Sequence, residues 1–354
     1  MQNVTFLIAT LGIVVAAIIA FTNGRSDFVS RFNEYVAAAG GVANALDIAQ
    51  AQSGYAARGF DWYQTFLSLS LPLYIVLYAI TSSIIGGEVK NARKAQIFGM
   101  PGSVVYTTLW MVLLIGGFQL LAGYDLLGHL GAVDPGALGL DFTPTFIELA
   151  GAMVYENLFL VLLLGVGFLL WTYVWLPINF LASTRILLAW SFDRLIPTKF
   201  SEITTRYRAP LWAIVAVILA AEVFLWLGIY SPAYSSAILY SIVAWFVAWV
   251  ILGIAGIVYP YRRKALFEAG PPATQRRIAG IPVISILGFL TLAVSIFTEW
   301  AVAQPFFKGD AEPNQYITVL GMLVIPLIIY VIAHFYHQSR GIPLKVQFSQ
   351  VPPE

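Results

Sequence analysis

The sequence has 354 residues, of which 59% are hydrophobic and only 10% are charged. An ordinary globular domain has about 25% charged residues, so a water-soluble protein of this size could not cover its surface with so few charges. Cysteine is absent from the sequence, which excludes disulfides, thiolate nucleophiles and Cys-ligated metals.

Apolar residues occur in blocks of about 20, the length that an α-helix needs to cross a hydrocarbon core about 30 Å thick. We predict an all-α polytopic membrane protein, because lipid offers the backbone no hydrogen-bond partner. The first block lacks a basic region and a small-residue cleavage site, so we interpret it as a span and not as a signal peptide. The eight predicted spans cover residues 4–21, 64–87, 104–123, 158–188, 211–229, 237–258, 281–301 and 317–335.

The basic residues predict the topology. With the N-terminus in the cytoplasm, only Arg25, Arg31, Arg58 and Lys308 among the 19 Lys and Arg residues fall outside. This distribution satisfies the positive-inside rule at every cytoplasmic loop. We therefore expect a single transmembrane domain over residues 1–339, a cytoplasmic tail over residues 340–354 and both termini in the cytoplasm.

Two predicted outer loops are long. Residues 22–63 carry Phe28, Phe32 and Val36 at helical spacing, which indicates a short surface helix. Residues 124–157 contain acidic residues but no Lys or Arg, and Thr143-Pro144 is typical of an N-cap followed by a first helical residue. Both loops are interpreted as solvated caps over the bundle, with a gating lid as the alternative.

Three segments near predicted cytoplasmic loops resemble the amino acid–polyamine–organocation superfamily of permeases. Gly86-Gly87-Glu88-Val89-Lys90-Asn91 resembles a signature after that family's sixth span, although the family usually has Pro where this chain has Ala92. A second segment resembles the stretch that joins the family's eighth and ninth spans, and Arg194 stands where the family typically has Gly. It runs over Ser183-Thr184-Arg185, Asp193-Arg194-Leu195-Ile196-Pro197 and Arg206-Tyr207-Arg208-Ala209-Pro210. The third is Pro260-Tyr261-Arg262-Arg263-Lys264 with Gly280-Ile281-Pro282.

This resemblance implies that the eight predicted spans correspond to the family's fifth to twelfth, and that its first four have no counterpart in this sequence. The family's fold is a LeuT-like bundle of two inverted five-helix repeats with two further spans. We therefore expect part of that bundle, with a broken first helix of the second repeat. The cytoplasmic motif residues are expected to fix topology, with basic groups pairing with acidic ones. They are Gly87, Glu88, Lys90, Arg185, Asp193 and Pro197.

The resemblance also implies where the substrate binds. In such transporters the site lies near the membrane midplane between two broken helices, where free backbone groups and half-helix dipoles bind the substrate. The expected broken helix is the span 64–87, which contains Pro72. Counting back from the signature places the unwound segment on Tyr74, Ile75, Val76, Leu77 and Tyr78. The alternative is a Pro-kinked helix whose polar groups bond to neighbouring helices.

Polar residues in other spans supply further candidates. Thr172, Trp175 and Asn179 share one face of the span 158–188, either contacting substrate or joining helices. In the same span, Gly165 and Gly167 are expected to permit close helix contact. Tyr240, Ser241 and Trp245 are weaker candidates for the cavity.

Glu222 is the acid that we place well inside a predicted span. A charge at that depth costs roughly 2.5–3.5 kcal/mol, so it is a candidate for proton coupling or a protonated Glu bonded to a neighbour. The three His residues show no metal-ligand spacing, and we assign them no role.

These features predict secondary active transport of amino acids or related amines across the plasma membrane by alternating access. Expected partners are the substrate, a proton or an exchanged solute, and the bilayer; we expect no enzyme activity, cofactor, catalytic residue, metal or nucleic acid. A phosphate-binding loop is absent, which argues against ATP coupling. The alternatives are a truncated or split permease that needs a chain with the four missing helices, a membrane-embedded enzyme, and a structural or sensor protein.

Overall fold

The computed structural model describes residues 2–56, 59–231, 234, 240–270, 272 and 274–341. Within these ranges the side chains of Gln2, Ser70, Tyr74, Leu77, Glu88 and Arg93 lie outside the description. Arg58 and the predicted tail after Gly341 also lie outside the described residues.

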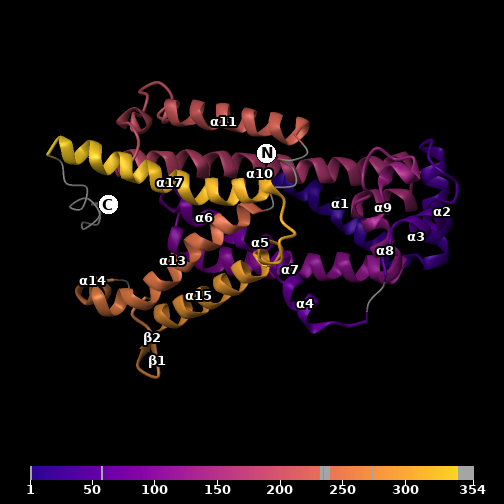
Figure 1. The fold of residues 1–354 in the computed structure, drawn as a ribbon, viewed down its shortest axis with the longest axis horizontal. Helices are drawn as coiled ribbons and strands as arrows, with labels where there is room; N and C mark the ends of the chain where they lie inside the picture. Colours follow the sequence, from indigo (N-terminus) through magenta and orange to yellow (C-terminus); the bar gives the residue numbers. More distant parts are fainter. Residues whose placement is uncertain are drawn as a thin grey trace. The chain divides into compact units, whose positions relative to one another are not determined.

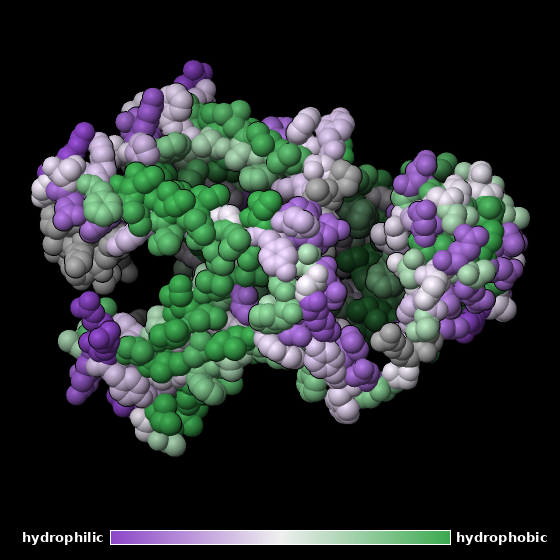
Figure 2. Space-filling view, viewed as in Figure 1, coloured by the Kyte–Doolittle hydropathy of each residue, from purple (hydrophilic) through white to green (hydrophobic). Residues whose placement is uncertain are grey.

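Eight helices in the described part of the chain are long and apolar enough to cross a membrane, which confirms the predicted number of spans. They cover Asn3–Thr22, Trp62–Ile84, Lys94–Ala122, Leu158–Phe192, Leu211–Tyr230, Ser241–Arg262, Val283–Val302 and Pro313–Ser339. Many large hydrophobic side chains of these helices are exposed, and broad hydrophobic surfaces are visible in Figure 2. The all-α prediction holds apart from one two-stranded hairpin, whereas the inverted-repeat arrangement stays a prediction.

Contacts along the chain divide it into two compact units. Unit 1 contains Met1–Phe60 and Ala79–Ala182, and unit 2 contains Asp61–Tyr78 and Ser183–Glu354. The elements of both units are labelled in Figure 1. The single transmembrane domain over residues 1–339 stays a prediction, because each unit contains several of the spans.

Unit 1 holds three long helices and a group of short ones. The long helices are α1 (Gln2–Thr22), α7 (Ala92–Ala122) and α10 (Leu158–Phe192). The last residues of α10, from Ser183 on, belong to unit 2. The short elements are α2 (Arg25–Ala38), α3 (Ala45–Gln52), α6 (Thr81–Ile84), η2 (Gly86–Glu88), α8 (Tyr124–Ala132), η3 (Pro135–Leu138) and α9 (Phe146–Met153).

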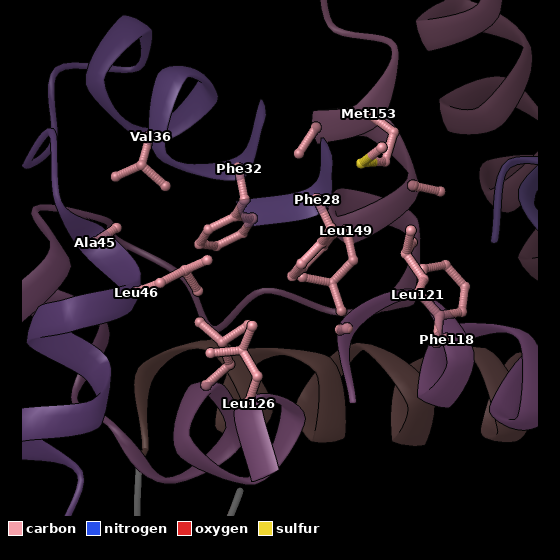
Figure 3. Packing of buried hydrophobic residues seen from close by; sticks show 14 of the residues in the cluster. Phe28, Phe32, Val36, Ala45, Leu46, Phe118, Leu121, Leu126, Leu149 and Met153 are labelled. Carbon is pink, nitrogen blue, oxygen red and sulfur yellow. The ribbon is translucent and has the colours of Figure 1, made fainter. Parts of the chain in front are cut away.

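The two long predicted outer loops fold together into one helical cap. Phe28, Phe32 and Val36 point from α2 into a hydrophobic core that Leu126 of α8 and Leu149 of α9 complete (Figure 3). The ends of α1 and α7 also enter this core. At its rim, Arg25 donates a 2.8 Å hydrogen bond to Asp125, and this guanidinium lowers the pKa of the Asp125 carboxyl.

The cap corrects two predictions. The loop 22–63 contains more than a short surface helix, because α2 and α3 both bury apolar faces against α8, η3 and α9. The N-cap of α9 is Thr145, two residues after the predicted Thr143. Its backbone N–H donates to Glu148, which forms the capping box that fixes the start of the helix.

Two glycines of α10 behave differently in unit 1. A Cβ on Gly167 would lie 3.1 Å from the Cα of Gly12 in α1, so the predicted close helix contact is confirmed at this position. A Cβ on Gly165 would meet nothing within 4 Å. Gly165 instead lines a pocket of about 380 Å³ beside α2 and α9.

Unit 2 contains the remaining helices. They are α4 (Trp62–Ser68), α5 (Ser70–Leu77), η4 (Thr198–Ser201), α11 (Leu211–Tyr230), α13 (Ser241–Arg262), α14 (Lys264–Ala269), α15 (Val283–Val302), α16 (Gln304–Lys308) and α17 (Pro313–Ser339), with η1 (Tyr78–Ile80) at the boundary between the units. The hairpin pairs β1 (Arg277–Ile278) with β2 (Ile281–Pro282). Its turn residues Ala279 and Gly280 both have positive φ, as a two-residue hairpin turn requires.

Helices α13 and α15 pack backbone to backbone through small residues. A Cβ on Gly288 would lie 2.8 Å from the Gly253 carbonyl oxygen and 2.8 Å from the Ile257 nitrogen. One turn away, Ser285 donates a 3.1 Å hydrogen bond to the Ile257 carbonyl. Small residues at helix contacts permit this approach, and in lipid the resulting packing is a main source of association.

Replacing Gly288 with Ala should lower the apparent melting temperature of the purified protein by several degrees. The new methyl group would have to push α13 and α15 apart, and such overpacking costs about 1–3 kcal/mol. Gly321→Ala in α17 is the matched control, because its nearest contact would be Ile325 Cδ1 at 3.9 Å. Equal melting temperatures for the two variants would contradict the close packing.

Candidate functional site

The segment from Asp61 to Leu77 is a helix interrupted close to a proline. Asp61 caps α4, because its carboxylate accepts a 2.8 Å hydrogen bond from the Tyr63 N–H. Helix α4 ends at Ser68, and α5 begins at Ser70 after a turn at Leu69. Pro72 explains this first break, because its ring excludes the carbonyl four residues earlier and it lacks an N–H to donate. That carbonyl belongs to Ser68.

A second break follows immediately after α5. The chain tightens into the 3₁₀ turn η1 at Tyr78–Ile80, forms one turn of α6 and reaches η2. The broken helix in this span stays a prediction, because the backbone at Leu69, Tyr78 and Ile80 remains in the right-handed helical region. Ile75 and Val76 lie within regular α5, and only Tyr78 of the predicted unwound residues lies in the break. No glycine occurs between Leu69 and Ile85, so the bulky residues continue the helix until Leu77.

Unit 2 brings the end of α5 against α13. Leu73 packs against Ile242, Val243 and Phe246, which form the buried cluster on α13. The Tyr78 and Trp245 rings lie 5.9 Å apart, measured between centroids. The aromatic residues predicted from two separate spans, Tyr78 and Trp245, therefore meet beside the second break. The side chain of Tyr74 lies outside the described residues.

Glu299 on α15 is a candidate that the sequence analysis missed. Its side chain is half-buried, and its Oε1 atom is shielded from solvent with no hydrogen-bond partner in the described part of the chain. The carboxyl group approaches the backbone of Val247, two residues after Trp245 on α13. The sequence analysis missed Glu299 because of its position: it lies beside Trp300 at the end of the predicted span, where a residue is normally exposed at the membrane–water interface.

Glu222 lies in a different environment from Glu299. It occupies the middle of α11, and its side chain is exposed. Helix α11 packs on η4, and Lys199 of η4 lies 4.0 Å from the Trp212 ring centroid. The coupling role of Glu222 stays a prediction.

The predicted residues of α10 belong to the other unit. Thr172 and Trp175 are exposed, and Asn179 donates a 3.2 Å hydrogen bond to the Trp175 carbonyl within the same helix. Asn179 thus obtains a partner near Pro177, which removes a backbone donor from this turn. Because these residues lie in unit 1, the structure does not place them relative to Tyr78.

Most residues of the predicted cytoplasmic motifs lie in turns at helix ends. Gly87 and Glu88 lie in η2, Lys90 follows them, and Asn91 has φ of 55° where α7 begins. Arg185 lies in the last turns of α10, and Asp193 follows its end. The Pro197 carbonyl accepts a 2.9 Å hydrogen bond from Ser191, which folds this turn back on α10.

Arg194 adopts the left-handed conformation, with φ of 59°. This is the position at which the resembled motif has glycine, the residue that adopts such a conformation without steric cost. The backbone of this turn therefore has the shape that the glycine of the motif would favour.

Among the described residues, no group of three or more His, Asp or Glu side chains could hold a metal ion. The segment Tyr78–Ile80 instead offers the aromatic faces of Tyr78 and Trp245, while Glu299 places a carboxyl group against α13. No protein-family model matches the chain, and comparisons with curated proteins and with solved structures gave no match.

The stability of the protein should respond to neutralisation of Glu299 but not to neutralisation of an exposed acid in a loop. Glu299→Gln removes a charge from a half-buried carboxyl that lacks a partner for Oε1. It should raise the apparent stability at pH 8, because burying a charged carboxylate costs more free energy than burying a neutral amide. The rise should shrink at pH 5, where more of the carboxyl is already protonated in the wild type.

Glu202→Gln is the control, because this exposed side chain lies in the loop after η4, outside the candidate spans, and should leave the melting temperature unchanged. A loss of several degrees in Glu299→Gln would show instead that the carboxylate has an ionic partner, and would remove the argument for an unpaired acid.

Proposed function

We propose that the chain is a secondary active transporter of amino acids or related amines, with the segment around Tyr78 as part of its substrate site. The observation that carries this proposal is a change of backbone hydrogen bonding within a candidate membrane span, at the turn at Leu69 and at the 3₁₀ turn Tyr78–Ile80. Irregular backbone at membrane depth is tolerated only where it is buried in protein or lines a cavity.

Each group near the break suits an amine or amino-acid ligand. Carbonyl groups at the change from α5 to the 3₁₀ turn can accept from an ammonium group, and backbone N–H groups at such a helix end can donate to a carboxylate. The faces of Tyr78 and Trp245 can contact an ammonium group or an apolar side chain. Glu299, against the neighbouring α13, can hold a proton that couples to transport.

The left-handed turn at Arg194 also supports the resemblance to amino acid–polyamine–organocation permeases, since the motif has glycine there. With that resemblance we propose the plasma membrane as location, alternating access as mechanism and cytoplasmic termini. The distribution of Lys and Arg supports this orientation.

In the resembled family, the other half of the site comes from spans that have no counterpart in this sequence. We therefore propose two forms of this function: the chain binds substrate alone, or it is a truncated or split permease that needs the four further helices.

Thermal stabilisation of the purified chain by the common amino acids and polyamines tests the proposal. A ligand that binds only the folded protein stabilises it by about 2.7 kcal/mol at a concentration one hundred times its dissociation constant. We expect one chemical class to raise the melting temperature, and Tyr78→Ala to lose most of that rise. Gly131→Ala in α8 of the helical cap, where a Cβ would meet nothing within 4 Å, should keep it.

The alternatives predict other outcomes. Stabilisation that appears only on co-expression with a four-span segment would assign the chain to a two-chain transporter. Stabilisation by no ligand in either form would contradict the transport proposal.

A further inference from the structure

Unit 2 contains a pocket that the transport proposal does not use. It has a volume of about 600 Å³ and lies between the turn after α10 and the last turns of α17. Both helices are candidate spans, ending at Phe192 and Ser339. The pocket therefore lies where two spans end, the depth at which lipid headgroups meet the protein.

The polar part of this pocket is basic. Arg194 contributes from the turn, and Arg340 and His337 contribute from α17. Its ten lining residues include no Asp or Glu, so the two guanidinium groups face no carboxylate within the lining. Arg340 also lies over the Tyr336 ring, 4.4 Å from its centroid, which holds the guanidinium near the pocket.

His337 joins the two walls of the pocket. Its Nε2 atom lies 2.9 Å from the Arg194 carbonyl oxygen. A carbonyl can only accept, so Nε2 carries the proton and donates this hydrogen bond. The contact ties α17 to the turn that bears Arg194, so both guanidinium groups are held on one pocket.

The rest of the lining is apolar and continues along α17. Ile196 lines the pocket on the turn, and Ile332 lines it on the helix. Ile328, Ile332, Tyr336 and Arg340 follow one another at intervals of four and share one face of α17. Ile332 is 63% exposed and Ile328 is 49% exposed, so this face is open beyond the pocket. An apolar stripe thus leads directly to a basic pocket.

We propose that this pocket binds an anionic phospholipid, with its phosphate between Arg194 and Arg340 and an acyl chain along Ile332 and Ile328. Arg forms strong charge-assisted hydrogen bonds with phosphate oxygens, and basic pockets at the ends of spans bind anionic headgroups. A free phosphate would use only the basic rim and leave the apolar stripe uncovered. A zwitterionic headgroup would place its own cation near the two guanidinium groups.

The test compares three additives on the purified chain in neutral detergent. We expect phosphatidylglycerol to raise the apparent melting temperature, and phosphatidylcholine and inorganic phosphate at equal concentration to have little effect. Arg194→Gln and Arg340→Gln should each weaken the apparent affinity for phosphatidylglycerol at least tenfold. Arg263→Gln, which removes a charge at the end of α13 outside the pocket, should leave it unchanged.

Arg194→Gly separates folding from binding. Glycine suits φ of 59°, so this variant should be as stable as the wild type without lipid, yet lose the response to phosphatidylglycerol. Equal stabilisation by inorganic phosphate would overturn the lipid assignment. An unchanged phosphatidylglycerol response in Arg194→Gly and Arg340→Gln would overturn the pocket itself.

Discussion

The contact between the glycines of α13 and α15 is the constraint on which the candidate site depends. Gly253, Gly256 and Gly288 let the two backbones approach until a single added methyl group would collide with main-chain atoms. This approach holds Glu299 of α15 against the α13 backbone at Val247. Helices α4 and α5 pack on α15, and Leu73 packs on the α13 cluster, so the interrupted segment rests on the same pair. Spreading these glycine contacts would therefore separate Glu299 from α13 and disturb the packing on which the segment Asp61–Tyr78 rests.

Unit 1 is stabilised by a different interaction. Its helical cap has a core of phenylalanine and aliphatic side chains like that of a water-soluble domain, whereas α1 and α10 meet through Gly12 and Gly167. Burial of apolar surface from water stabilises the cap, but between helices in lipid this driving force is absent and close packing replaces it. The two modes meet at the ends of α1 and α7, whose last apolar residues enter the core of the cap. The cap thereby fixes the ends of these two helices.

The eight spans could be predicted because a long apolar block has only one stable form in lipid. The interrupted helix expected from Pro72 stays a prediction, and counting from a motif placed the unwound segment on Ile75 and Val76, which continue α5. Glu299 was missed because composition cannot distinguish an interfacial acid from one held against a neighbouring helix. The cap was underestimated for a similar reason: Phe32 and Leu149 belong to one core only once two distant loops meet. Sequence periodicity predicts elements, whereas these features arise from their packing.

The central claim is that ligand binds at the break near Tyr78, and the absence of native cysteine allows a direct measurement. A cysteine introduced at Ala79 within the 3₁₀ turn can be labelled with a maleimide, with and without the amino acid or amine that stabilises the chain. The account predicts that ligand slows labelling of Ala79→Cys, while labelling of Ser339→Cys at the end of α17 stays unchanged. Equal labelling rates at Ala79→Cys with and without a stabilising ligand would contradict a site at this break.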